Sequence, residues 1–88
     1  MKPLNYAILK FFTKMPSGSV VEIMEHLNDD YINFKSFNKK SIVNALMTAE
    51  ANGLIEEIDM ILDKNGELVI YYRANDEGKE TINTYIED

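Results

Sequence analysis

Residues 52–75 read NGLIEEIDMILDKNGELVIYYRAN, and this stretch decides the fold. From Leu54 the hydrophobic pattern changes from a helical period to an alternating one, which predicts strands over residues 54–63 and 67–74. Asn65-Gly66 between the strands predicts a β-hairpin closed by a two-residue turn, because both residues tolerate a positive φ.

The two-residue turn sets the expected register of the hairpin. Lys64 pairs with Glu67, and Ile61 pairs with Ile70. One face then carries Ile58, Met60, Leu62, Val69 and Tyr71, and the other carries Ile61, Leu68, Ile70 and Tyr72. Both faces are rather apolar, so we expect one to cover the core and the other to be available to a second subunit.

Two helices are predicted near the start of the chain. Apolar residues at helical spacing predict the first over residues 4–15, with a solvent side that carries Lys10, Thr13 and Lys14. Ser19 followed by Glu22 is a capping-box pattern, which predicts that a second helix begins there and ends at residues 28–30.

Asn38 is the expected cap of a third helix, which runs to about Asn52 and is ended by Gly53. Its buried face is expected to hold Ile42, Leu46 and Ala49. Its exposed face is expected to hold Lys40, Ser41, Asn44, Thr48 and Ala51. Asn75 is the expected cap of a last helix, whose first turn is acidic, as the helix dipole favours.

The composition limits the classes of function. A chain of 88 residues, 45% hydrophobic and 27% charged, predicts one globular domain over residues 1–88. The absence of cysteine excludes disulfides and thiolate metal sites, and the single His26 provides no zinc cluster. We find no phosphate-binding glycine loop, nucleophile elbow or paired catalytic carboxylates, so we expect no catalytic residues, no metal, no cofactor and no enzyme.

The expected location is the cytoplasm. No stretch approaches the roughly 18–20 unbroken apolar residues of a membrane span. The first residues also lack the apolar run and the cleavage site of a signal peptide.

Charge is distributed unevenly along the chain. The formal net charge is −6, which argues against unselective coating of nucleic acid. Residues 1–44 nevertheless hold six basic and four acidic groups, whereas residues 45–88 hold three and eleven. The nineteen residues from Tyr31 to Ala49 contain three lysines and no acid. This asymmetry is the first indication of a nucleic-acid partner.

The order helix, helix, helix, hairpin, helix is that of a winged helix-turn-helix, and three stretches strengthen this resemblance. SVVEIMEHL (19–27) resembles the second helix of such domains. The end of the third helix in MarR and PadR regulators is similar to the stretch that runs from Ser41 through Leu46 and Ala49 to GLIE (53–56). YYRANDEGKE (71–80) resembles their strand-to-helix junction, and NYAILK (5–10) resembles the opening of small YjcQ-like winged-helix proteins of Gram-positive bacteria.

The resemblance implies an α+β, mainly α fold and a small bacterial transcriptional regulator that binds double-stranded DNA. In a helix-turn-helix the exposed side of the third helix enters the major groove. Lysine suits phosphate or guanine, asparagine suits adenine, and serine and threonine suit either. The expected DNA-binding residues are therefore Lys35, Asn38, Lys39, Lys40, Ser41, Asn44 and Thr48, with Lys64 and Asn65 at the tip of the hairpin.

Other features favour an alternative function or add a partner. The hairpin carries five acids against Lys64 and Arg73, although a wing beside phosphates normally presents more cations. The alternative is a winged-helix protein–protein interaction module without DNA binding. A homodimer is expected through the first and last helices, with contacts from Leu9, Phe12, Tyr85 and Ile86.

Overall fold

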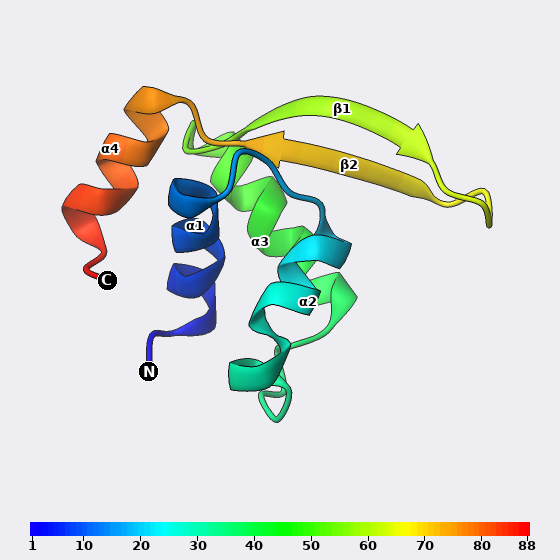
Figure 1. Ribbon diagram of the computed structural model, residues 1–88, viewed down its shortest axis with the longest axis horizontal. Helices are drawn as coiled ribbons and strands as arrows, with labels where there is room; N and C mark the ends of the chain where they lie inside the picture. Colours follow the sequence, from blue (N-terminus) through cyan, green and yellow to red (C-terminus); the bar gives the residue numbers. More distant parts are fainter.

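The computed structural model describes residues 1–88, which form four helices and one β-hairpin (Figure 1). Their bounds are α1 Leu4–Lys14, α2 Val20–Tyr31, α3 Lys39–Ala51, β1 Glu56–Leu62, β2 Leu68–Arg73 and α4 Asp76–Tyr85. The hairpin projects from the helices, and α4 lies beside α1 at the other end of the molecule. This is the predicted element order, and no helix has the length and apolarity needed to cross a membrane.

The predicted caps are confirmed. Ser19 and Glu22 form a capping box, in which the Ser19 N–H donates to Glu22 Oε1 at 2.9 Å. Asn38 Oδ1 accepts from the Ser41 N–H at 2.9 Å, and Asn75 Oδ1 accepts from the Gly78 N–H at 2.8 Å. Each side chain satisfies an N–H group that has no partner within its own helix, and so marks where that helix begins.

The core lies where α1, α2 and α3 meet under the base of the hairpin. Phe12, Ile23 and Ile42 are fully buried there, one from each of the three helices. Ile82 of α4 and Ile86, the residue that follows this helix, cover α1 from the other side. Since α1 is enclosed by neighbours on several sides, its apolar face is wide, as its sequence indicated.

The predicted hairpin register is wrong by one residue. Ile61 pairs with Val69 and Met60 with Ile70, whereas the prediction paired Ile61 with Ile70. The turn is a three-residue loop: the Gly66 N–H donates to the Asp63 carbonyl, and Gly66 has φ +78°. Asn65 has no positive φ, which excludes the expected two-residue turn.

The corrected register redistributes the side chains between the two faces. Val69 and Tyr71 share a face with Ile61, not with Met60 and Leu62 as predicted. The other face carries Leu68, Ile70 and Tyr72 and lies against the helices, where Tyr72 is buried. A bulge between Glu57 and Asp59 shifts the register once more near the base of the hairpin.

Two further contacts fix the hairpin and α4. Gly18 and Tyr72 exchange backbone hydrogen bonds of 2.9 Å, so the segment between α1 and α2 pairs with the outer edge of β2. Gly78 approaches the carbonyl oxygen of Leu54 so closely that a Cβ atom would collide with it. The glycine at this position is therefore required by packing, beyond the mild cost it imposes on the helix.

Lys10 does not lie on the solvent side of α1, where the sequence placed it. It is buried, with its Nζ 2.7 Å from Asn83 Oδ1 and 3.1 Å from Asp88 Oδ1. The burial follows from α4, which packs on the side of α1 that a single amphipathic helix would leave open.

Candidate nucleic-acid interface

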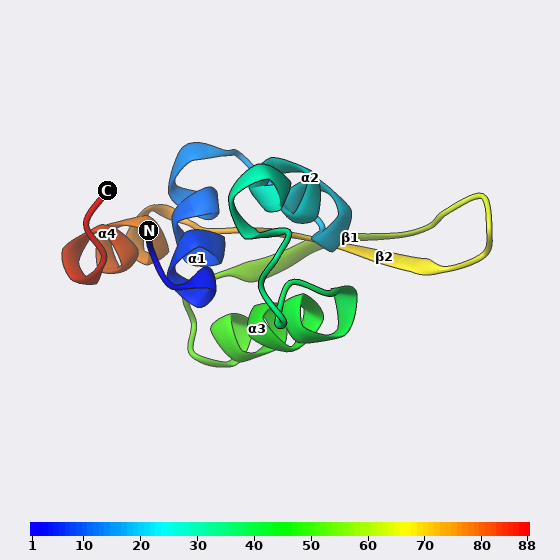
Figure 2. The same cartoon turned by 90° about the horizontal axis from the view of Figure 1, so that it is seen from below.

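Helix α3 presents an outer surface that carries polar residues and the apolar Met47, which is 56% exposed. Ile42, Leu46 and Ala49 form its buried face, as predicted. Positions three and four apart lie on the same side of a helix, so Lys40, Asn44 and Ala51 lie on the side opposite the core. All three residues are exposed. Figure 2 shows α3 on one side of the molecule and α2 on the other, so this outer surface is not covered by α2.

The two flanks of α3 face different neighbours. Lys39 and Val43 lie on the flank beneath the hairpin, where they line a small pocket with residues of β2. Ser41, Asn44 and Thr48 line a larger hollow of about 340 Å³ between α3 and α1. Asn5 of α1 and Asn52 at the end of α3 complete its polar lining. Neither residue stands out in the sequence, because nothing in the helical pattern of α1 shows that it lies beside α3.

Asn38 has a structural role that limits it as a DNA contact. Its Oδ1 accepts from the Ser41 N–H at 2.9 Å, and its Nδ2 donates to the Lys35 carbonyl at 3.1 Å. One donor and one acceptor of the carboxamide are therefore occupied within the protein, which orients the side chain at the start of α3.

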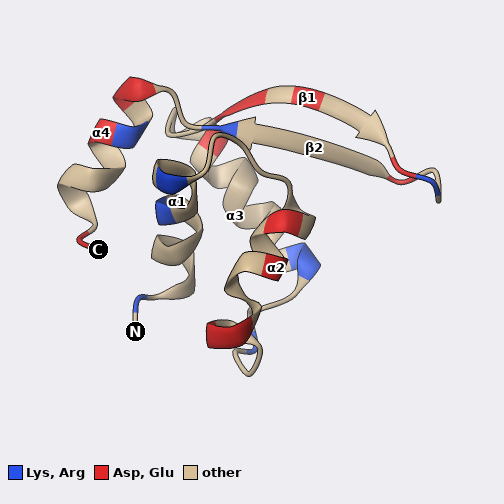
Figure 3. Ribbon diagram, viewed as in Figure 1, with Lys and Arg blue, Asp and Glu red and all other residues tan.

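The three lysines of the acid-free segment differ in their pairing. Lys39 Nζ lies 3.1 Å from Glu67 Oε2 of the hairpin. Lys35 and Lys40 are exposed and form no ion pair within residues 1–88. Figure 3 shows cations in the loop before α3 and at the start of that helix, and acids on α2, α4 and the hairpin; Glu50 is the one acid of α3 and lies near its end. Lys40 is thus an unpaired cation on the outer surface of the helix.

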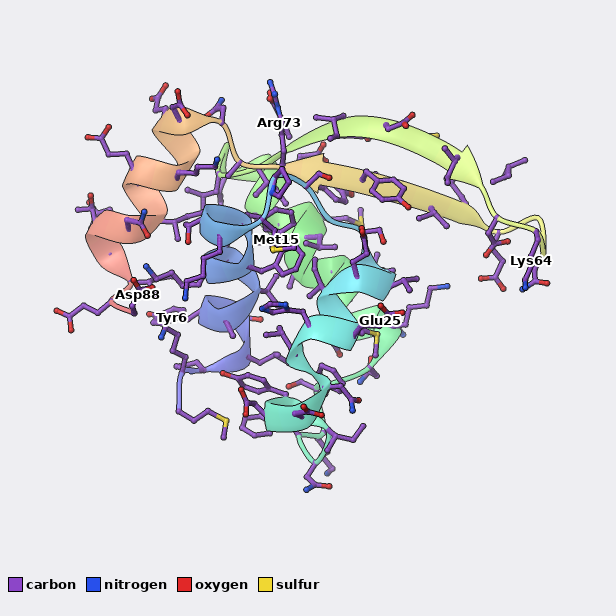
Figure 4. The ribbon with its side chains drawn as sticks, viewed as in Figure 1. Tyr6, Met15, Glu25, Lys64, Arg73 and Asp88 are labelled. Carbon is purple, nitrogen blue, oxygen red and sulfur yellow. The ribbon has the colours of Figure 1, made fainter.

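Glu25 and Asp29 of α2 do not lie over α3. Ile23, Leu27 and Tyr31 form the buried face of α2, which places Glu25 and Asp29 on the opposite, exposed side of that helix. Figure 4 shows Glu25 on α2, with α3 behind that helix. Repulsion between these carboxylates and a duplex at α3 is therefore limited by distance.

The hairpin places Lys64 and Asn65 at its exposed tip, far from the helices (Figure 4). Two of its acids are paired: Glu67 with Lys39, and Glu56 with Arg73 at 2.7 Å. Asp63 holds the loop, because its Oδ1 accepts from the N–H groups of Asn65 and Glu67. The acidity that weighed against a DNA-contacting wing is thus partly neutralised within the protein.

His26 of α2 and Tyr72 of β2 both pack against other parts of the fold. His26 packs edge-on against Phe11, with 5.3 Å between the ring centres. Burial raises the pKa of the Tyr72 phenol, and the charges of Glu50 and Glu57 raise it further. Residues 1–88 contain no group of three His, Cys, Asp or Glu side chains placed to hold a metal ion.

Two of the four predicted dimer contacts are incorrect. Phe12 and Ile86 are buried in the core of the subunit, so neither can reach a partner. Leu9 is half-buried and lines the hollow beside α3. Tyr85 alone is widely exposed, at 81%. The helical pattern could not separate residues that bind α4 from residues that bind another chain.

These elements define a winged helix-turn-helix fold, with α2 and α3 as the helix pair and the hairpin as the wing. The chain is similar to the crystal structure of a PadR-like transcriptional regulator from Bacillus cereus, with a TM-score of 0.67 and 23% identity. The similarity covers 93% of this chain and 76% of that one. No family model and no curated protein matches the sequence.

Proposed function

We propose that the protein is a DNA-binding transcriptional regulator that inserts α3 into the major groove. The observation that carries the proposal is the outer surface of α3, where the unpaired cation Lys40 lies beside the uncovered amide of Asn44. The PadR-like regulator with a similar fold supports the same class of function. One fold serves many functions, and these side chains supply the chemistry that DNA binding uses.

The residues would divide the work of recognition. Lys35 and Lys40 would contact phosphates, which give affinity without sequence preference. Asn44 and Thr48 would reach base edges, since both are exposed near the middle of the helix. Ser41, half-buried at the edge of the hollow, would contribute from the side of α1.

The test of DNA binding is fluorescence anisotropy with a mixed-sequence duplex over a series of salt concentrations. We expect affinity that falls steeply with salt and is about tenfold or more weaker in Lys40→Glu. Lys79→Glu on α4 is the matched control, because it makes the same charge change at a lysine that forms no ion pair. Absence of salt-sensitive binding in the wild type, even at low salt, would show that the proposal is wrong.

The test of sequence recognition is selection of preferred duplexes from a random pool. Asn44→Ala should lower affinity for the selected duplex by about 1–3 kcal/mol and should change mixed-sequence binding much less. An equal loss on both kinds of duplex would assign Asn44 to the phosphate backbone.

The alternative, a protein-interaction module, is favoured by the exposed apolar residues of the wing. Ile58, Met60, Leu62 and Leu68 are between 46% and 69% exposed. A wild-type protein that binds no duplex would leave this surface as the candidate interface.

A further inference from the structure

One ion pair connects the wing to the recognition helix. The described chain contains four ion pairs, and only the pair of Lys39 and Glu67 joins α3 to the hairpin. Its N–O distance is 3.1 Å, and the same atoms satisfy the geometry of a hydrogen bond. The contact joins residues 28 positions apart, so it depends on the tertiary structure.

Local structure positions both partners. Asn38 caps α3 and makes Lys39 the first residue of the helix, on the flank that faces the wing. On the other side, the Asp63 carboxylate accepts from the Glu67 N–H at 2.9 Å, at the end of the loop that Gly66 closes. The two charged groups therefore meet because the cap of α3 places Lys39 and the hairpin loop held by Asp63 places Glu67.

The stem of Lys39 lies over a small apolar space of about 110 Å³ between α3 and the wing. Lys39 is the only polar residue in the lining, which otherwise consists of Val20, Val43, Leu46, Leu68, Ile70 and Tyr72. Its apolar stem can cover this space while its ammonium group reaches solvent and Glu67. Packing thus holds the charge at the edge of α3, beside the path of a phosphate backbone when the helix occupies a major groove.

We propose that in the free protein Glu67 pairs with the ammonium group of Lys39 at the position that a DNA phosphate takes in the complex. This pairing thereby limits the affinity for DNA. This inference rests on the proposed function. Both side chains are about 60% exposed, at 60% for Lys39 and 62% for Glu67, so the pair is accessible to an incoming phosphate. A phosphate that binds Lys39 displaces Glu67, whose freed carboxylate then lies near the duplex and is repelled by it.

Counterion release gives this exchange a specific signature. A lysine that neutralises a phosphate normally contributes about −0.9 to the slope of log affinity against log salt. In the wild type, the freed Glu67 carboxylate lies near the duplex, and salt screens its repulsion, so affinity falls less steeply with salt. In Glu67→Gln no carboxylate is freed, so this opposing effect is absent and the slope is steeper.

The experiment measures binding of the same mixed-sequence duplex by wild type, Glu67→Gln, Lys39→Gln/Glu67→Gln and the control Glu57→Gln. Glu57 is an exposed acid of the same hairpin that pairs with no cation, so its variant reports the general effect of charge. Glu67→Gln should bind roughly three- to tenfold more tightly at low salt, with a steeper slope than the wild type. The double variant should lose both gains.

The inference is overturned if Glu67→Gln and Glu57→Gln behave alike, or if the slope of Glu67→Gln equals that of the wild type. It is also overturned if the double variant keeps the tighter binding, because the gain then does not pass through Lys39. Failure of the proposed function is a separate result, in which neither the wild type nor Glu67→Gln binds the duplex at low salt. Circular dichroism confirms that each variant is folded.

Discussion

The ammonium group of Lys10 is buried between α1 and α4, where it donates to Asn83 Oδ1 at 2.7 Å. Asp88 contacts the same nitrogen at 3.1 Å from the segment after α4. A buried cation needs such partners, because loss of water is otherwise uncompensated. The pair Lys10–Asn83 therefore contributes to the docking of the last helix.

We expect Asn83→Ala to lower the free energy of unfolding by about 1–2 kcal/mol, because the buried ammonium group loses a hydrogen bond to a side chain. Chemical denaturation measures this change. Thr84→Ala is the matched control, since Thr84 is exposed and its hydroxyl bonds only to Glu80 within the same helix. Equal losses in the two variants would show that the contact with Lys10 has no stabilising role.

Asp88 should make stability depend on pH in the acid range. A hydrogen bond from Lys10 lowers the pKa of its carboxyl, and the charges of Lys10 and Lys14 lower it further. A group with a lowered pKa in the folded state stabilises the protein above its unfolded pKa, near 4. This stabilisation is lost as the pH falls through the folded pKa.

The pKa of Asp88 can be measured by NMR titration. We expect Lys10→Gln to return it most of the way toward its ordinary value, and Lys14→Gln to change it less, because Lys14 lies at 3.6 Å. A larger effect of Lys14→Gln would contradict the assigned order of causes.

Gly78→Ala should destabilise the protein by about 1–3 kcal/mol, although the same change inside an exposed helix usually stabilises it. The added Cβ atom would collide with the carbonyl oxygen of Leu54. Only a movement of the backbone can relieve this collision. Thermal denaturation measures the effect, with Glu77→Ala as the control at an exposed neighbouring position. A stabilised Gly78→Ala variant would show that α4 does not approach Leu54 so closely.

A homodimer through the first and last helices remains a proposal, and Tyr85 is its best test. Sedimentation at micromolar concentration should detect a dimer, and Tyr85→Ser should weaken it tenfold or more, because large exposed aromatic side chains often dominate interfaces. Lys64→Glu at the far end of the wing is the control (Figure 4). A monomeric wild type would contradict the proposal.

Features set by neighbouring residues were predictable from the sequence. Asn38, Asn75 and the Ser19–Glu22 pair could be assigned as caps, because each acts on N–H groups within three residues of itself. The helix-turn-helix order and the exposed face of α3 follow from the same local patterns and from hydrophobic periodicity.

Features that depend on distant segments were not predictable. Asn65-Gly66 suits a two-residue turn, but it also suits a three-residue loop that ends in a left-handed glycine, and the loop is what forms. Lys10 reads as a surface residue until α4 is placed against it. The pairing of Lys39 with Glu67 requires the position of the wing, which no pattern within α3 contains.

The backbone hydrogen bonds between Gly18 and Tyr72 hold the wing at its base and leave its tip free. This pairing joins β2 to the segment that leads into α2, so the root of the hairpin is held against the helix pair. Flexure should concentrate where the bulge between Glu57 and Asp59 interrupts the ladder. The outer part of the hairpin can then follow the contour of whatever it touches while its root stays in place.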